Sequence, residues 1–219
     1  MSFRQLITGV ILAGGRGSRM GGQDKGLVLL SGKPLYQHIL ARLQPQVGEV
    51  LINANRNQPR YSESQLTVIS DLNNHFSGPL AGMQAALHHA KTDWLLFVPC
   101  DVPTFPLNLA EKMFNEKEKH LACYACDTER EHPTFALLHR SLKTQLDDYL
   151  TRGDRKLMLF MHEINAKSVT FSPEPGSFAN LNTPEDNRNW ELQQKELWRK
   201  IRYLYLELPL TAAQEKRRY

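Results

Sequence analysis

Short apolar segments alternate with amphipathic segments along this chain, and that alternation constrains the fold more than any other feature. The segments that fit buried strands are Leu6–Ala13, Glu49–Ala54, Thr67–Ser70, Trp94–Pro99, Leu121–Cys126 and Thr134–Leu138. The segments with helical periodicity are Pro34–Leu43, Pro79–Ala90, Pro106–Lys117, Ser141–Leu150 and Arg155–Ile164. Strands separated by helices form βαβ units with helices on both faces of the sheet. We therefore predict a three-layer α/β fold with a mostly parallel sheet.

Composition indicates one globular domain with room for an appendage. The chain has 219 residues, 41% of them hydrophobic and 23% charged, so it can bury a core without disulfides or a structural metal. The N-terminal apolar run imitates a short signal peptide, but the organised sequence after it favours a first strand. Cys123 and Cys126 lie in a predicted strand, and no second pair completes a zinc site. We expect a cytoplasmic protein with no membrane span.

The C-terminal segment differs from the rest of the chain. Residues 191–219 contain seven basic and four acidic residues, a net charge of +3 out of +4 for the whole chain. The pI of 9.0 therefore reflects this tail, and we expect no nucleic-acid partner. A helical pattern runs from Pro184 to Leu208 with one apolar face. We predict a domain over residues 1–190 and a basic amphipathic helical extension over 191–219, which packs on the domain or binds a partner.

The first predicted strand runs into a glycine-rich segment, residues 12–25, LAGGRGSRMGGQDK. Open α/β sheets bind ligands at the carboxyl ends of their strands, and glycines let backbone N–H groups approach phosphate oxygens. Arg19 and Lys25 can neutralise a polyphosphate. The segment is not a Walker loop, because the only Gly-Lys pair precedes a proline, nor a dinucleotide fingerprint, because Met20 replaces the third glycine. The alternative is a solvated glycine loop.

A second polar segment, Pro99-Cys100-Asp101-Val102-Pro103, follows a predicted strand. A carboxylate at a strand's carboxyl end, beside phosphates, is well placed to hold Mg²⁺. An isolated Asp at such a position is commonly a turn or cap residue. The neighbouring glycine loop favours the metal interpretation for Asp101.

Together these segments resemble the molybdenum cofactor guanylyltransferase family, whose fold is similar to that of nucleotide-diphospho-sugar transferases. The resemblance rests on residues 12–25, Asn53-Ala54-Asn55-Arg56, Gly78-Pro79-Leu80-Ala81-Gly82-Met83, Pro99-Cys100-Asp101 and Asn180-Leu181-Asn182-Thr183-Pro184. It implies a Rossmann-like nucleotidyltransferase that transfers GMP from GTP to molybdopterin, releases pyrophosphate and uses Mg²⁺. We expect a monomer whose further partner is a molybdenum-insertion protein or a recipient molybdoenzyme.

The resemblance also assigns residues to the nucleotide. The GTP-binding residues it implies are Leu12, Ala13, Gly14, Gly15, Lys25, Asn53, Asp71, Gly78 and Asp101. Arg19, Lys25 and Asp101 would be catalytic, with Asp101 as the metal ligand. An aspartate such as Asp71 can accept hydrogen bonds from N1–H and the amino group of guanine, a paired donor edge that adenine and cytosine lack. A turn role is the alternative for Asp71. Gly78 opens a helix whose free N–H groups form an anion site.

On the molybdopterin side the resemblance implies Asn180 and Asn182. Gly82, a glycine in the first turn of a helix, and Arg155, a cation for the molybdopterin phosphate, are further candidates. Structural alternatives stay open: packing against the sheet for Gly82, a solvated charge for Arg155, and a helix cap at Asn182 or Thr183. No general base is needed, because the attacking phosphate monoester is already ionised near neutral pH.

Two other functions also stay open. The first is a cytidylyl- or sugar-phosphate nucleotidylyltransferase of the same fold. Gly14-Gly15 and Asp24 before Lys25 favour the guanylyl family, because the loop of cytidylyl relatives resembles Leu-Ala-Ala-Gly. The second is a non-catalytic adaptor that passes the cofactor to an apoenzyme through the tail helix, against which Lys25 and Asp101 argue.

Overall fold

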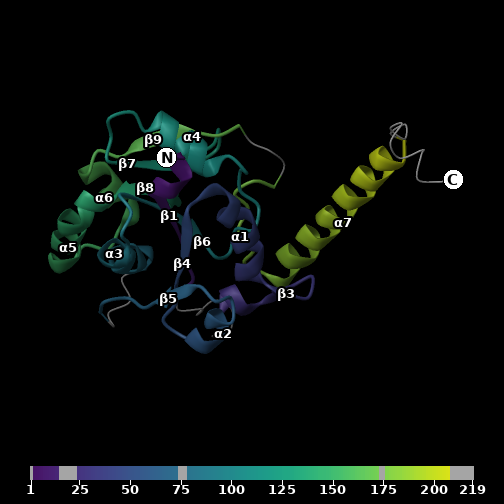
Figure 1. Cartoon of the computed structure of the whole chain (residues 1–219), viewed down its shortest axis with the longest axis horizontal. Coiled ribbons are helices and arrows are strands. Elements are labelled where there is room, and N and C mark those ends of the chain that lie inside the picture. Colours follow the sequence, from purple (N-terminus) through teal and green to yellow (C-terminus); the bar gives the residue numbers. More distant parts are fainter. Residues whose placement is uncertain (1, 15–23, 74–77, 173–175, 208–219) are drawn as a thin grey trace. The chain divides into compact units, whose positions relative to one another are not determined.

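The computed structural model describes residues 2–14, 24–73, 78–172 and 176–207. The chain divides into two compact units, Met1–Leu181 and Asn182–Tyr219. The first unit is built on a seven-stranded sheet of order β5-β4-β1-β6-β8-β7-β9 (Figure 1). Its strands are β1 (Ile7–Leu12), β4 (Glu49–Asn53), β5 (Thr67–Ile69), β6 (Trp94–Pro99), β7 (Ala122–Cys126), β8 (Glu131–His139) and β9 (Lys167–Thr170).

The direction of the strands divides the sheet into two halves. Strands β5, β4, β1 and β6 are mutually parallel. Strand β8 is antiparallel to both of its neighbours, β6 and β7, whereas β7 and β9 are parallel. A small antiparallel ribbon of β2 (Leu29–Leu30) and β3 (Lys33–Pro34) lies outside this sheet. Of the seven strands described in the main sheet, β8 alone is reversed, so its first residues lie at the edge where the other six strands end.

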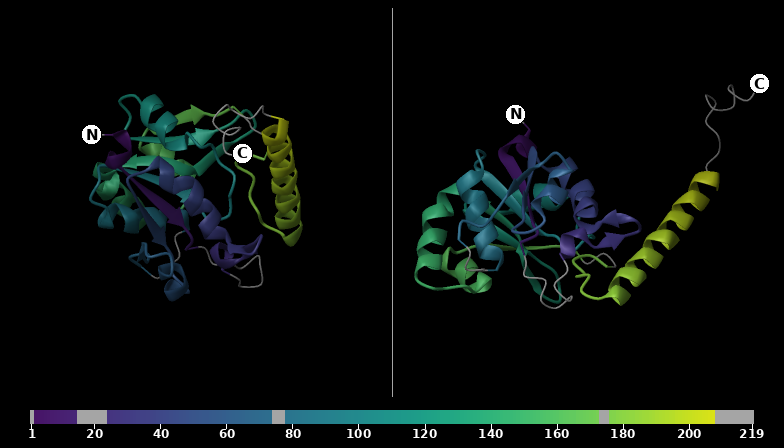
Figure 2. Two further views of the ribbon diagram at one scale, coloured as in Figure 1. Left: turned by 45° about the vertical axis from the view of Figure 1, so that its right-hand side comes forward. Right: turned by 90° about the horizontal axis from the view of Figure 1, so that it is seen from below.

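Helices cover both faces of the sheet. They are α1 (Leu35–Leu43), α2 (Gln58–Ser62), α3 (Pro79–His89), α4 (Leu109–Glu116), α5 (Lys143–Thr151) and α6 (Leu157–Glu163), with 3₁₀ turns at Phe3–Leu6, Lys25–Leu27, Gln44–Gln46 and Arg140–Leu142. Helices α1 and α4 contribute to one buried core, and α3, α5 and α6 contribute to the other. Figure 1 shows these two groups on opposite sides of the sheet, and Figure 2 shows the same layers from two further directions.

Side-chain alternation along the central strands explains why there are two cores. In β1, Ile7 and Ile11 enter the core beneath α1 and α4, whereas Val10 and Leu12 enter the core beneath α3. Successive side chains of a strand point to opposite faces, so a strand covered on both sides must be apolar throughout. This burial confirms the predicted three-layer α/β fold with a mostly parallel sheet.

Several predicted boundaries were wrong. Helix α4 begins at Leu109 and not at Pro106, because residues 103–108 form an irregular connection. Strand β8 begins at Glu131, three residues before the predicted start, and it includes Pro133. The sequence patterns missed β9, α2 and the β2–β3 ribbon, which contain only two to five residues each. Segments this short show too few periods to be recognised.

The second unit contains α7 (Pro184–Glu207), which confirms the predicted C-terminal helix up to Glu207. Leu208 and the rest of the predicted extension lie outside the described residues. The backbone N–H of Asp186 donates to Thr183 Oγ1 (3.1 Å), and Asp186 Oδ2 accepts from the backbone N–H groups of Asn182 (2.9 Å) and Thr183 (2.8 Å). This reciprocal pattern is a capping box, with Thr183 as the cap. Within the described ranges, none of the helices combines the length and apolarity of a bilayer-spanning segment.

Candidate active site

The carboxyl ends of four parallel strands form the edge of the sheet that carries the candidate site. The ladder of backbone hydrogen bonds continues past the strands, with Ala13 N–H donating to Asn53 O (2.8 Å), Ala54 N–H to Ile69 O (2.9 Å) and Cys100 N–H to Leu12 O (3.2 Å). The two neighbours of β1 in the sheet, β4 and β6, lie on opposite sides of it. Ligands of open α/β sheets bind where the strand order reverses in this way. The residues just beyond β1, β4, β5 and β6 are therefore the candidates for ligand binding.

Lys25 and Asp101 form an ion pair at this edge. Lys25 Nζ donates to Asp101 Oδ2 at 3.0 Å, and the side chains are 25% and 17% exposed. Partial burial keeps such a pair less screened by salt than a surface ion pair. The structure thus brings together the predicted phosphate-binding lysine and the predicted metal-binding aspartate.

A second contact network holds Lys25 in place. Its neighbour Asp24 accepts hydrogen bonds from Tyr61 Oη (2.5 Å) at Oδ1 and from Asn57 Nδ2 (3.1 Å) at Oδ2. The backbone carbonyl of Asp24 accepts from the N–H of Leu27 (3.0 Å), which begins the 3₁₀ turn that contains Lys25. Tyr61 is fully buried, and burial raises the pKa of its phenol, so the hydroxyl stays protonated and can donate. Sequence patterns predicted no role for Tyr61, because α2 has only five residues.

A carboxylate–amide cluster lies on the other side of β1. Asp71 Oδ1 accepts from Asn53 Nδ2 (2.9 Å) and Asp71 Oδ2 from Asn55 Nδ2 (2.8 Å), while the Asp71 backbone N–H donates to Asn55 Oδ1 (2.9 Å). Asn55 Nδ2 also donates to the carbonyl oxygen of Gly14 (3.3 Å). Each carboxylate oxygen has two acceptor positions, so both oxygens of Asp71 keep acceptor capacity after these bonds. Sequence analysis assigned Asn53 and Asp71 to the site but gave no separate role to Asn55.

Two glycines make room for this cluster. A Cβ at Gly14 would stand 2.8 Å from Asn53 Oδ1 and 2.9 Å from Asn55 Nδ2. A Cβ at Gly82, in the first turn of α3, would overlap the Asn53 side chain and stand 2.9 Å from Leu12 Cδ2. Packing therefore explains why residue 82 is a glycine, and its role toward molybdopterin stays a prediction. Gly78, just before α3, has φ +65° and ψ −149°, a conformation that is essentially restricted to glycine.

The remaining predicted residues are more dispersed. Asn180 precedes Leu181, whose backbone N–H donates to the carbonyl oxygen of Asp101 (2.8 Å), so Asn180 lies one residue from a backbone contact with Asp101. Arg155 lies in the connection between α5 and α6, where its guanidinium donates to the backbone oxygens of Leu150 (2.7 Å) and Asp154 (2.6 Å). Asn182 belongs to the second unit. Gly15 and Arg19 lie outside the described residues.

The side chains at this edge fit a metal ion that is shared with a substrate. Across residues 2–14, 24–73, 78–172 and 176–207, no group of three or more His, Cys, Asp or Glu side chains could hold a metal ion. Mg²⁺ is commonly held by one or two carboxylates together with substrate phosphates and water. Asp101, with the Lys25 ammonium group 3.0 Å away, matches that requirement. Burial raises the pKa of the Cys123 thiol to about 12, so this side chain is a protonated core residue.

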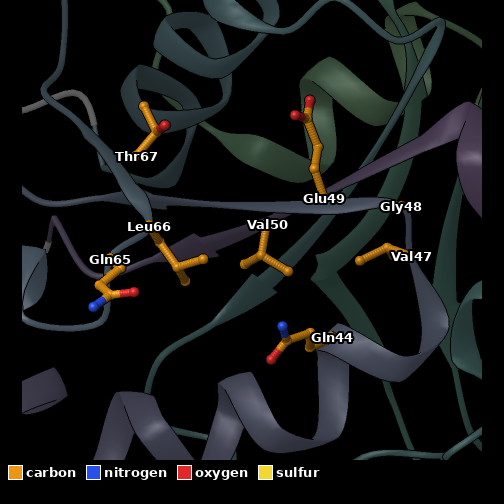
Figure 3. Close-up of a pocket in the computed structure, with 8 residues that line it drawn as sticks. All are labelled: Gln44, Val47, Gly48, Glu49, Val50, Gln65, Leu66 and Thr67. Carbon is orange, nitrogen blue, oxygen red and sulfur yellow. The ribbon is translucent and has the colours of Figure 1, made fainter.

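A pocket of about 270 Å³ lies elsewhere in the molecule (Figure 3). It is lined by Gln44, Val47, Gly48, Glu49, Val50, Gln65, Leu66 and Thr67. Glu49 and Thr67 are the first residues of β4 and β5, so this pocket opens at the amino edge of the sheet, opposite the candidate site.

The geometry defines a class of protein before any comparison is made. A mostly parallel sheet contains a lysine–aspartate pair and a carboxylate–amide cluster at the point where its strand order reverses. This combination is typical of nucleotide-binding transferases of the α/β class.

Comparison with known proteins specifies the family. The family model of the MobA-like NTP transferase domain matches residues 9–167, and the chain belongs to that family. A molybdenum cofactor guanylyltransferase of Yersinia pseudotuberculosis serotype O:1b is 59% identical over 189 residues, which cover 86% of this chain and 97% of the relative. A protein of the same name from Yersinia pestis strain Pestoides F is 58% identical over the same shares of the two chains.

A solved structure shows the same fold. The crystal structure of molybdopterin-guanine dinucleotide biosynthesis protein A from Archaeoglobus fulgidus superposes with a TM-score of 0.69 at 23% identity. The match covers 86% of this chain and 99% of that chain. At this level of identity the likeness concerns the fold.

The Tyr61–Asp24 contact yields a prediction for nucleotide binding. Tyr61→Phe removes the hydroxyl that donates to Asp24, and hydrogen bonds to charged groups contribute about 1.5–3 kcal/mol. We expect the KM for the nucleoside triphosphate to rise about tenfold, because Asp24 orients the turn that carries Lys25. Steady-state kinetics measure this effect.

The matched control is Tyr36→Phe, since the two tyrosine rings pack at 5.0 Å between centroids and Tyr36 does not contact Asp24. We expect that variant to keep the wild-type KM. An equal rise of KM in both variants would show that ring packing, and not the Asp24 contact, is responsible.

Proposed function

We propose that this protein transfers GMP from GTP to molybdopterin, forming the guanine dinucleotide of the cofactor and pyrophosphate. The observation that carries the proposal is the identity of 59% with a molybdenum cofactor guanylyltransferase over 97% of that relative's length. The described site supports it, because Lys25, Asn53, Asp71 and Asp101 gather at one edge of the sheet.

Asp71 supports guanine as the base. Its carboxylate is fixed by Asn53 and Asn55 from one side and keeps two acceptor positions. Guanine presents two adjacent donors, N1–H and the 2-amino group, that match two carboxylate oxygens. A pre-positioned carboxylate therefore favours guanine over adenine and cytosine.

Gly14 argues against the cytidylyl alternative. A loop of the Leu-Ala-Ala-Gly type would place an alanine at position 14, and its Cβ would stand within 3 Å of both Asn53 and Asn55. The adaptor alternative leaves the Lys25–Asp101 pair unexplained, since a protein that only binds a nucleotide needs no residue at the leaving phosphate. Both observations favour a guanylyl transferase.

The proposed reaction demands positioning and charge stabilisation. An oxygen of the molybdopterin phosphate attacks the α-phosphorus of GTP, and the bond from that phosphorus to the bridging oxygen of the β-phosphate breaks as pyrophosphate leaves. Lys25 and Arg19 would neutralise the phosphate charge that develops in this step. Asp101 would hold Mg²⁺, which supplies further charge stabilisation when bound. The attacking phosphate is already ionised, so no side chain has to remove a proton.

The remaining assignments are proposed on the same basis. Leu12, Ala13, Gly14, Gly15 and Gly78 would contribute backbone groups or space at the GTP site, and Gly82, Arg155, Asn180 and Asn182 would contact molybdopterin. We propose a monomeric, cytoplasmic protein with a catalytic domain over residues 1–190 and a helical extension over 191–219. A molybdenum-insertion protein or a recipient molybdoenzyme would be its partner.

Asp101→Ala tests the metal and phosphate role. We expect GMP transfer to fall at least about 100-fold, because a charge-stabilising group is lost. Folding should be retained, since the backbone carbonyl that accepts from Leu181 is unchanged. The control is Asp93→Ala at the opposite end of β6, where Asp93 Oδ1 pairs with Arg140 Nε at 3.5 Å. Wild-type turnover by Asp101→Ala at saturating Mg²⁺ would exclude Asp101 from the mechanism.

Asp71→Asn tests guanine recognition. An amide offers one acceptor oxygen in place of two, so we expect a loss of about 1–3 kcal/mol that is larger for GTP than for ITP, which lacks the 2-amino group. The ratio of kcat/KM for the two nucleotides measures this difference. Asn55→Ala removes a hydrogen bond to Asp71 but leaves the Asp71 charge in place. This variant should lower kcat/KM for GTP and for ITP by the same factor. An unchanged GTP-to-ITP ratio in Asp71→Asn would contradict the guanine assignment.

Truncation after residue 190 tests the domain proposal. The described GTP residues all belong to the first unit, so we expect the truncated protein to keep its affinity for GTP. A ligand at 100 times its Kd stabilises a protein by about 2.7 kcal/mol, and the GTP-induced rise in Tm should match that of the full chain. A folded truncation that no longer binds GTP would show that the extension contributes to the site.

A further inference from the structure

A hydrogen-bonded pair of side chains joins the turn between β7 and β8 to the start of β8, and the proposed reaction does not use it. His132 Nε2 lies 2.7 Å from Asp127 Oδ2, and the two side chains are only 7% and 12% exposed. Asp127 Oδ1 also accepts from the backbone N–H groups of Glu129 (2.8 Å) and Arg130 (2.9 Å). The hydrogen bond from His132, with those from the backbone, lowers the pKa of Asp127 to about 2. Asp127 is therefore ionised, and it fixes both the turn and the imidazole.

His132 and its turn hold Phe178 at two points. The imidazole stacks on the Phe178 ring with 4.4 Å between centroids and an interplanar angle of 18°. Arg130 Nη2 donates to the backbone oxygen of Phe178 (3.2 Å). Phe178 has φ +59°, in the left-handed region that costs energy for a residue with a side chain. Its conformation therefore depends on these surrounding contacts.

The segment from Phe178 to Leu181 connects this turn to the active site. Phe178 N–H donates to the carbonyl oxygen of Thr104 (2.9 Å), and Leu181 N–H donates to the carbonyl oxygen of Asp101 (2.8 Å). Asn180 lies between these two anchors. A shift of Phe178 would thus move Asn180 and loosen the backbone support of Asp101.

Sheet order indicates which substrate this segment serves. The described nucleotide residues follow β1, β4 and β5, on one side of Asp101, which follows β6. The β7–β8 turn and the start of β8 lie on the other side of Asp101 at the same edge. Because GTP occupies the first half, the acceptor phosphate has to approach its α-phosphorus from the half that contains β8 and β7.

We infer that His132, held by Asp127, is a positioning residue for the acceptor substrate, because it fixes the Phe178–Leu181 segment beside Asp101. This inference rests on the proposed function and assigns the acceptor half of the same site. His132 itself is buried and acts through Phe178.

The test compares three variants of the full-length chain with GTP, Mg²⁺ and molybdopterin. His132→Phe keeps a ring against Phe178 but removes the donor to Asp127, and His132→Gln keeps a donor near the position of Nε2. We expect His132→Phe to raise the KM for molybdopterin about tenfold, with the KM for GTP and the GTP-induced shift in Tm within about twofold of wild type. His132→Gln should restore most of the affinity for molybdopterin.

His139→Phe is the matched control. His139 lies at the other end of β8, packs on Trp94 with ring centroids 4.9 Å apart, and is remote from Phe178. The His139→Phe variant should change neither the KM for molybdopterin nor the KM for GTP. If His132→Phe does not fold, Asp127→Asn replaces it, because the amide keeps an oxygen that accepts from the backbone of the turn. We expect Asp127→Asn to raise the KM for molybdopterin and to leave the KM for GTP unchanged.

Three results would overturn the inference: an unchanged KM for molybdopterin in His132→Phe, an equal rise of both KM values, or the same effect in His139→Phe. Failure of the wild-type protein to transfer GMP to molybdopterin would instead reject the proposed function, and the acceptor role of His132 with it. The two failures are therefore distinguishable by the wild-type assay.

Discussion

The buried amide of Asn53 is the contact on which the nucleotide half of the site depends. Its side chain is 2% exposed, and a buried amide is costly unless its hydrogen bonds are satisfied. The bond to Asp71 uses one of its two amide N–H donors, and its backbone oxygen accepts from Ala13 at the end of β1. Gly14 and Gly82 leave the space that the amide occupies. Asn53 thus joins the end of β1 to the carboxylate proposed to recognise guanine.

Asp101 is the point at which two halves of the molecule meet. Its carboxylate contacts Lys25, which follows the glycine loop, and its backbone carbonyl contacts Leu181, 80 residues later in the chain. The first contact joins it to the nucleotide half, and the second joins it to the segment that carries Asn180. The side chain and the backbone of Asp101 thus connect the segment after the first strand with the segment that precedes the second unit.

Supporting contacts at this edge have a common organisation. Residues proposed to meet substrate, or near one in sequence, are held by side chains from distant parts of the chain. Lys25 is placed through Asp24 and Tyr61, and Asp71 is fixed by Asn53 and Asn55. Phe178, which precedes Asn180, is held by His132 and Asp127. Such supports restrict the orientation of the substrate-facing groups, and this pre-organisation is what charge-stabilising sites require.

The sequence alone determined the alternation of strands and helices and the position of Asp101 just after a strand, because apolar periodicity and loop chemistry are local properties. It could not determine β9, α2 or the early start of β8, since short elements form only when neighbouring strands or a buried tyrosine stabilise them. The network of Tyr61, Asn57 and Asp24 and the stack of His132 on Phe178 were also decided by the tertiary structure. These contacts join residues up to 46 positions apart, and no local pattern records which distant side chains meet when the sheet and its helices close around a core.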